Sequence, residues 1–203
     1  VAEEKIHVTG MMKFDTAVIA DRIDGDDALA AELGINTAAM KLLVAGGTGP
    51  GEEQMLLEMW KTLKDRHPSA RLAVVPRKPE RFDEVARLIE SAGFKAFRRS
   101  QGVGPAAENL AADTIILGDT MGELRKFYSL ATAVFVGRSL VPMGGSDMIE
   151  SAALGKATAF GPYTYNFPQA DKLAEHGCVR VQDISSLAQQ LDSWLSSSDN
   201  ATQ

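Results

Sequence analysis

Short apolar runs alternate with amphipathic stretches along most of the chain. From Lys41 onward the apolar runs are continuous, and many of them end in glycine or proline, which is typical of buried strands. They predict strands at residues 41–47, 71–76, 94–100, 114–119, 133–137, 157–162 and 178–181. The stretches between them place apolar residues at helical spacing and carry helix start and stop signals. They predict helices at residues 50–68, 79–93, 121–131, 147–155, 167–177 and 183–197.

The order of these elements predicts the fold class. Continuously apolar strands are buried on both faces, and strands separated by helices form right-handed crossovers between parallel neighbours. We therefore expect a doubly wound, Rossmann-like α/β domain with a parallel sheet and helices on both faces. Ligands of such sheets bind beyond the carboxyl ends of the strands, so the candidate site residues are those that directly follow each strand.

The amino-acid composition limits the classes of molecule that the protein can bind. The 203 residues carry a net charge of −6, which argues against nucleic acid as a partner because phosphate backbones require a basic face. Cys178 is the single cysteine and the three histidines are scattered, so no metal-ligand spacing is present. No apolar run approaches the roughly 20 residues of a membrane span, and no signal peptide is visible. The sequence thus suggests a soluble, cytoplasmic domain without a metal, and a polar, disordered tail at 197–203.

A basic pair follows the second predicted strand. Arg77 and Lys78 lie directly after the strand at 71–76 and before a helix that begins near Pro79. A guanidinium at this position can hold a phosphate through two parallel hydrogen bonds. The alternative is a surface ion pair with Glu80 or Glu84, which would have little energetic effect.

The segment 144–150 combines a glycine pair with two carboxylates. Gly144 and Gly145 permit positive φ and a close approach of backbone to a ligand, and the helix that follows would direct N–H groups to the same place. Asp147 and Glu150 also fit a capping box, with Asp147 as the cap, while Glu150 could instead reach ribose hydroxyls. The residues alone favour neither reading.

The same two readings apply after the strand at 114–119. Thr120 and Glu123 have capping-box spacing, and Thr120, Met121 and Gly122 could present backbone N–H groups to a ligand. Two such helix starts after neighbouring strands favour a binding site more than either one alone.

Five segments in order resemble one family. "VTGMMKFD", "LLVAGGTGPGEE", "VVPRKPERF", "LGDTMGELRKFYSLATAVFVGRSLVPMGG" and "ESAALGKATAFGPYTYNF" are similar to the carboxyl-terminal half of the 3-deoxy-D-manno-octulosonic acid (Kdo) transferases. The resemblance covers residues 8–181. It implies one half of a GT-B glycosyltransferase, in which residues 1–15 are the interdomain connection and residues 16–196 the domain that binds the donor, CMP-Kdo.

The resemblance also implies an activity. Members transfer Kdo with inversion to a lipid A precursor in lipopolysaccharide biosynthesis, without a metal or other cofactor. Their amino-terminal domain supplies the catalytic carboxylate, the acceptor site and the membrane contact. We therefore expect no catalytic residue in this chain, and a location at the cytoplasmic face of the inner membrane for the full-length protein.

The resemblance implies roles for individual residues of this chain, although several positions differ from the family's sequence. Arg77 matches the family's arginine at the donor phosphate, residues 120–123 match its nucleotide-facing helix start, and Glu150 matches its acid on the ribose. The family reads Gly-Gly-His-Asn-Pro-Leu-Glu-Pro where this chain has Gly144, Gly145, Ser146, Asp147, Met148, Ile149, Glu150 and Ser151. Lys78 replaces a histidine. An acid at 147 would repel a phosphate unless it were protonated or turned towards the helix start.

The predicted donor-binding set is therefore Arg77, Lys78, Thr120, Met121, Gly122, Glu123, Gly144, Gly145, Ser146, Asp147 and Glu150. Two alternatives stay open because the departures fall in this set. The chain could be a nucleotide-binding module without transfer activity, or part of a GT-B transferase that uses another nucleotide sugar.

Overall fold

The computed structural model of the protein describes residues 19–102 and 111–196. Its centre is a seven-stranded sheet in the order β3-β4-β2-β1-β5-β6-β7, and every pair of neighbouring strands is parallel. The fold class predicted from the sequence is confirmed. The predictions for residues 1–15 and for the tail at 197–203 lie outside the described residues.

The strands agree closely with the predicted ones. They are β1 (Lys41–Thr48), β2 (Ala70–Pro76), β3 (Lys95–Arg98), β4 (Thr114–Leu117), β5 (Ala133–Val136), β6 (Ala157–Phe160) and β7 (Val179–Arg180). The α-helices are α2 (Asp26–Glu32), α3 (Glu52–Arg66), α4 (Phe82–Ser91), α5 (Leu124–Leu130), α6 (Ile149–Ala153), α7 (Ala170–Glu175) and α8 (Ile184–Ser196). Short 3-10 turns, η2 (Pro79–Arg81) and η3 (Arg99–Gln101), precede α4 and follow β3.

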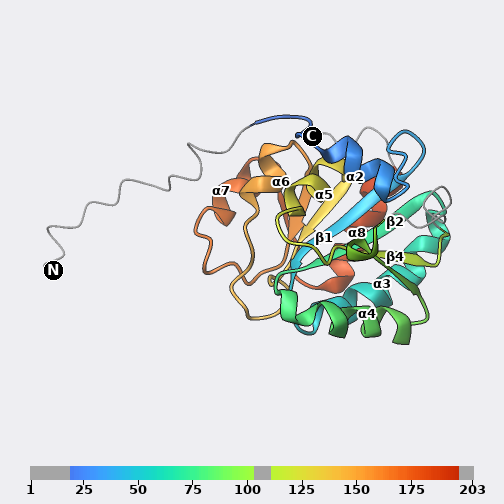
Figure 1. Ribbon diagram of the computed structural model, residues 1–203. Helices are drawn as coiled ribbons and strands as arrows, with labels where there is room; N and C mark the ends of the chain where they lie inside the picture. Colours follow the sequence, from blue (N-terminus) through green and yellow to red (C-terminus); the bar gives the residue numbers. More distant parts are fainter. Residues whose placement is uncertain (1–18, 103–110, 197–203) are drawn as a thin grey trace, which may run out of the picture.

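Two apolar clusters lie on opposite faces of the sheet, which explains why the strands are continuously apolar. Leu43 and Ala45 of β1 belong to the cluster that contains α3, α4 and α8, whereas Leu42 and Val44 belong to the cluster of α2, α5 and α7. Successive side chains of a strand point to opposite faces, so both must be apolar here. Figure 1 shows α2 and α5 above the sheet and α3 and α4 below it.

Each predicted helix is present but shorter than its predicted bounds. Helix α2 was not predicted, although it packs on α5. The helix expected at 121–131 begins only at Leu124, because Gly122 has a positive φ of 82° that a helix cannot contain. The helix expected at 147–155 begins at Ile149, after a turn in which Asp147 accepts a hydrogen bond from the Ile149 N–H.

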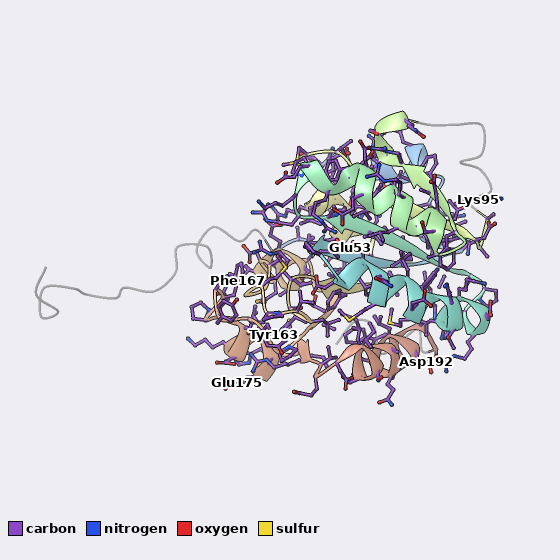
Figure 2. The ribbon with its side chains drawn as sticks, turned by 90° about the horizontal axis from the view of Figure 1, so that it is seen from below. Glu53, Lys95, Tyr163, Phe167, Glu175 and Asp192 are labelled. Carbon is purple, nitrogen blue, oxygen red and sulfur yellow. The ribbon has the colours of Figure 1, made fainter. Side chains whose placement is uncertain are left out.

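The strand order places the switch point beside β1. Strand β1 pairs with β2 on one side and with β5 on the other, so the chain winds outwards in both directions from this strand. Figure 2 shows Tyr163 and Phe167, which follow β6, at one end of the molecule, and Lys95, which begins β3, at the opposite end. The carboxyl edge of the sheet, where ligands of this fold bind, is therefore the end with Tyr163 and Phe167. In residues 19–102 and 111–196, no helix is long and apolar enough to cross a membrane.

Candidate functional site

A pocket of about 520 Å³ lies at the carboxyl edge, around the switch point. Residues at or after the carboxyl ends of β1, β2, β4, β5 and β6 all contribute to its wall. The volume is typical of a small-molecule site. The structure brings eight of the predicted residues together in this wall: Arg77, Thr120, Met121, Gly122, Gly145, Ser146, Asp147 and Glu150.

Three predicted residues do not line the pocket. The Lys78 ammonium lies 3.5 Å from the Glu80 carboxylate at the surface, which is the ion pair considered as an alternative role for the basic pair. Glu123 accepts hydrogen bonds from the Thr120 hydroxyl and from Arg99, so its carboxylate is engaged in side-chain contacts. Gly144 lies behind the wall, beneath the segment that follows β6.

Arg77, unlike Lys78, lies in the pocket wall. Its backbone N–H donates to the carbonyl of Thr48, which joins the ends of β1 and β2. Within the described parts of the chain its side chain forms no ion pair, while Glu84 is occupied by Arg81. The guanidinium at the end of β2 thus lines the pocket with its donors available for an anion.

The two glycines serve packing as well as backbone conformation. Gly144 and Gly145 have φ of 85° and 87°, as the sequence suggested. A Cβ on Gly144 would lie 2.0 Å from the Asn166 side-chain nitrogen, and one on Gly145 would lie 3.3 Å from the Phe167 ring. The pair therefore lets the segment after β6 close over the segment after β5, which forms one wall of the pocket.

Neither predicted capping box forms. The residue at the N-cap of α6 is Met148 and that of α5 is Glu123, and neither helix has a side-chain cap. Instead, the Asp147 carboxylate accepts from the Ile149 N–H at 3.0 Å and is turned towards the start of α6. Ser146 donates its hydroxyl hydrogen to the Gly47 carbonyl at 2.9 Å, which ties the segment after β5 to the end of β1.

Eight lining residues were not in the predicted set, and they complete the wall: Gly47, Val75, Pro76, Leu124, Arg125, Arg138, Asn166 and Phe167. Gly47, Val75 and Pro76 lie at the carboxyl ends of strands, and Arg138 follows β5 by two residues, which is a usable signal. Nothing in the local pattern distinguishes Arg125, Asn166 or Phe167 from ordinary helix and loop residues, because their position depends on how separate segments pack.

A buried glutamate organises the switch point. Glu52, at the start of α3, is fully buried and accepts four backbone N–H groups. Its Oε1 binds the N–H groups of Ser139 and Leu140 at 2.8 and 2.9 Å, and its Oε2 binds those of Gly49 and Arg138. Burial raises the pKa of the Glu52 carboxyl, although the four N–H groups act in the opposite direction. This carboxylate joins the end of β1 to the segment after β5.

A buried ion pair supports the end of β2. Glu53, also fully buried, accepts from the Arg81 guanidinium at 2.6 and 3.2 Å and from the Thr48 hydroxyl at 2.8 Å. Figure 2 shows Glu53 in the interior of the molecule. Because Thr48 in turn binds the Arg77 backbone, this network holds in place the turn that carries Arg77.

Asp119, two residues after β4, has a similar structural role on the other side of β2. It accepts from Arg98 at 2.6 Å and from the backbone and hydroxyl of Ser100 at 2.7 and 2.6 Å. Burial alone would raise the pKa of this carboxyl, but the Ser100 and Arg98 hydrogen bonds outweigh burial and lower it. The carboxylate joins the turn after β3 to the end of β4.

The charges of the wall suit an anionic ligand with hydroxyl groups. Three arginines, at 77, 125 and 138, face two carboxylates, at 147 and 150. Guanidinium groups bind phosphate or carboxylate, and a carboxylate such as that of Glu150 accepts from hydroxyls. Helix α6 has only five residues, so the positive potential of the pocket depends mainly on the arginines. In the described ranges, no group of three or more His, Cys, Asp or Glu side chains could hold a metal ion.

Curated relatives share most of this chain. It is 33% identical over 181 residues to a 3-deoxy-D-manno-octulosonic acid transferase of Bordetella pertussis, which is 87% of this chain and 40% of the relative. It is 33% identical over 182 residues to the transferase of that name from Haemophilus influenzae, which is 90% of this chain and 40% of the relative. The chain thus spans about 40% of the length of these relatives. No family model matches it.

A solved structure matches both sequence and fold. The C-terminal CMP-Kdo binding domain of WaaA from Acinetobacter baumannii superposes with a TM-score of 0.68 at 32% identity, over 79% of this chain and 81% of that one. The parallel sheet and the pocket at its carboxyl edge thus define a Rossmann-like half of a GT-B glycosyltransferase. The chain belongs to the 3-deoxy-D-manno-octulosonic acid transferase family.

Proposed function

We propose that this chain binds CMP-Kdo and forms the donor-binding half of an inverting Kdo transferase. The observation that carries the proposal is the match, at 32% identity over 81% of its length, to a solved CMP-Kdo binding domain. The pocket supports it, because an arginine-rich wall with an acid suits a nucleotide that carries a phosphate and a ribose.

Five lining residues have a proposed role in binding the donor. Arg77 binds the donor phosphate, backbone N–H groups of Thr120, Met121 and Gly122 face the nucleotide, and Glu150 accepts from the ribose hydroxyls. Donors already aimed at the phosphate stabilise the charge that develops there as the sugar leaves. Glu123 acts indirectly, by holding the Thr120 side chain.

The rest of the reaction requires residues outside this chain. We propose that the full-length protein transfers Kdo to a lipid A precursor in lipopolysaccharide biosynthesis, without a metal or other cofactor. The general base, the acceptor site and the membrane contact would lie in an amino-terminal domain at the cytoplasmic face of the inner membrane. This chain alone is then expected to transfer no sugar, and transfer by the full-length protein is expected to persist in EDTA.

The test is a titration of the chain with CMP, followed by amide NMR shifts, with UMP and AMP as competing nucleotides. We expect CMP-selective shifts at Arg77, residues 120–122 and residues 145–150. Arg77→Gln should weaken CMP binding by about tenfold or more, because it removes a charge-assisted hydrogen bond.

Lys95→Gln is the matched control, since it removes a cation from the opposite end of the molecule. It should leave CMP binding unchanged. Equal shifts with UMP or AMP would refute the choice of CMP and favour another nucleotide sugar. An unchanged affinity in Arg77→Gln would refute the role of Arg77.

A further inference from the structure

Arg138 has an unfavourable backbone conformation at the switch point. Its φ is 57°, and it is the one non-glycine residue with positive φ in the described ranges 19–102 and 111–196. This left-handed conformation brings Cβ close to the backbone and favours glycine. Strain of this kind at a pocket suggests a function for the side chain that glycine lacks.

The backbone contacts of Arg138 do not require an arginine. Its N–H donates to the buried Glu52 carboxylate, and its carbonyl accepts from the Gly145 N–H at 2.7 Å. On the Arg138 side both bonds use main-chain atoms only, so glycine at this position would form them without strain. The reason for an arginine must therefore be sought in its side chain.

The side chain is held against the pocket wall and keeps unused donors. Its stem packs over Gly49, where an added Cβ would lie 2.9 Å from the Arg138 Cγ, and its Nη2 donates to the Met143 carbonyl at 3.3 Å. The Nε is buried without a hydrogen-bond partner. Within the described residues no carboxylate pairs with this guanidinium, although it lines the pocket. Buried donors normally have acceptors, so this group lacks an anionic partner.

Arg138 and Arg77 reach the pocket from different sides of β1. Arg77 follows β2 and Arg138 follows β5, and these two strands flank β1. The Arg138 side chain packs on Gly49 and Met143, beside the start of α3. The pocket therefore presents two separate guanidinium groups to an anionic ligand.

We propose that Arg138 binds the carboxylate of the donor's sugar and so selects an ulosonic-acid donor over a neutral sugar. This inference rests on the proposed function, in which the donor carries two anionic groups, a phosphate held by Arg77 and a sugar carboxylate. A planar guanidinium binds a carboxylate through two parallel hydrogen bonds. Arg138 is then a second, separate anion site in the same pocket.

The experiment compares two ligands and four proteins. The affinities of CMP and CMP-Kdo are measured by calorimetry for the wild-type chain, Arg138→Gln, Arg138→Gly and Arg77→Gln. The wild type should bind CMP-Kdo more tightly than CMP. Both variants at 138 should lose that gain, about tenfold or more, and should weaken binding of CMP much less than binding of CMP-Kdo. Arg77→Gln should weaken binding of both ligands.

A melting curve shows that the variants are folded. Arg138→Gly should melt at a higher temperature than Arg138→Gln, because it removes the strain, yet bind CMP-Kdo no better.

Three results would overturn the inference, and they are distinguishable. An unchanged CMP-Kdo gain in both variants would show that the side chain binds no sugar carboxylate. Equal losses for CMP and CMP-Kdo would assign Arg138 to the phosphate. Either result leaves the proposed function standing. A wild-type chain that binds neither ligand would refute the proposed function and this inference together.

Discussion

Glu52 and Glu53 show how much a single residue contributes to this site. Both are fully buried and begin the same helix, yet they contact different segments. Glu52 binds backbone N–H groups after β1 and β5, and Glu53 binds Arg81 and Thr48 near the end of β2. In the sequence they resemble an ordinary acidic first turn. In the fold they position the turns that carry Arg138 and Arg77.

Glu52→Gln should destabilise the protein strongly. The glutamine side chain has one oxygen that accepts and one NH2 group that cannot accept. Its NH2 group would face either the N–H groups of Gly49 and Arg138 or those of Ser139 and Leu140. We expect a loss of about 3 kcal/mol in the free energy of unfolding, because two buried N–H groups lose their acceptor. Urea unfolding measures it. Glu58→Gln, on the exposed side of the same helix, is the control and should have little effect. Equal stability of the two variants would contradict the role of Glu52.

Arg81→Leu tests the buried ion pair. It leaves the Glu53 carboxylate in the interior without its cation, so the free energy of unfolding should fall by about 3 kcal/mol. The matched control is Lys78→Gln, three residues earlier, which removes only a surface ion pair and should cause no measurable change. Urea unfolding of both variants measures the change in the free energy of unfolding. An Arg81→Leu protein as stable as the wild type would show that the pair does not stabilise the fold.

At the scale of elements, two connections interlock to form the pocket wall. The segment after β6 packs on the glycine pair after β5, and the Tyr163 N–H donates to the Ser139 carbonyl at 3.0 Å. Asn166 donates its N–H to the Gly144 carbonyl at 3.2 Å. The wall is therefore made by two strand–helix connections that depend on each other.

Gly144→Ala should disrupt this contact. The alanine Cβ at position 144 would be strained by the positive φ and would overlap the Asn166 side chain. Gly155 has a positive φ of 62° as well, but an added Cβ there would meet open space, so Gly155→Ala is the control. We expect Gly144→Ala to be less stable than Gly155→Ala by about 2 kcal/mol, because only the first adds overpacking to backbone strain. Thermal unfolding compares them. Equal losses would mean that Asn166 moves aside without cost.

At the scale of the whole molecule, two buried carboxylates lie on elements that are far apart in the chain. Asp26, at the start of α2, binds Arg22 and Ser129, and Asp119, after β4, binds Arg98. The Arg22 hydrogen bond, above all, lowers the pKa of Asp26, and the Ser100 and Arg98 hydrogen bonds lower that of Asp119. Both groups favour the folded state only while they are ionised.

These two groups predict the acid dependence of stability. A carboxyl whose folded pKa lies below its unfolded value contributes stability above the unfolded value, about 3.9 for Asp, and loses it as the pH falls further. The free energy of unfolding should therefore decline below about pH 4. Asp119→Asn should be less stable at neutral pH and show a shallower decline, measured by urea unfolding at several pH values.

Asp113→Asn, which changes a half-exposed carboxylate before β4, is the control. The raised pKa of Glu52 acts in the opposite direction, but it is common to every protein compared and cancels. Parallel pH curves for the wild type and Asp119→Asn would contradict the prediction.

Much of the fold was predictable because its signals are local. The continuous apolar runs identified the seven strands of the sheet, and glycine and proline marked the strand ends where Arg77, Thr120 and Gly145 lie in the pocket wall. The starts of α5 and α6 were misplaced, because a capping-box pattern describes a preference that Gly122 and the Asp147 turn override. Helix α2 was missed because it lies upstream of the regular alternation.

The amino-acid order thus determined the α/β class, the edge of the sheet that carries the site and the family, since each depends on periodicity or on short motifs. Tertiary packing alone decided which residues meet there. It turned Lys78 and Glu123 to other partners, brought Arg138 and Asn166 into the wall, and buried Glu52 among backbone donors. Those outcomes depend on contacts between segments far apart in the chain, and no local pattern encodes such contacts.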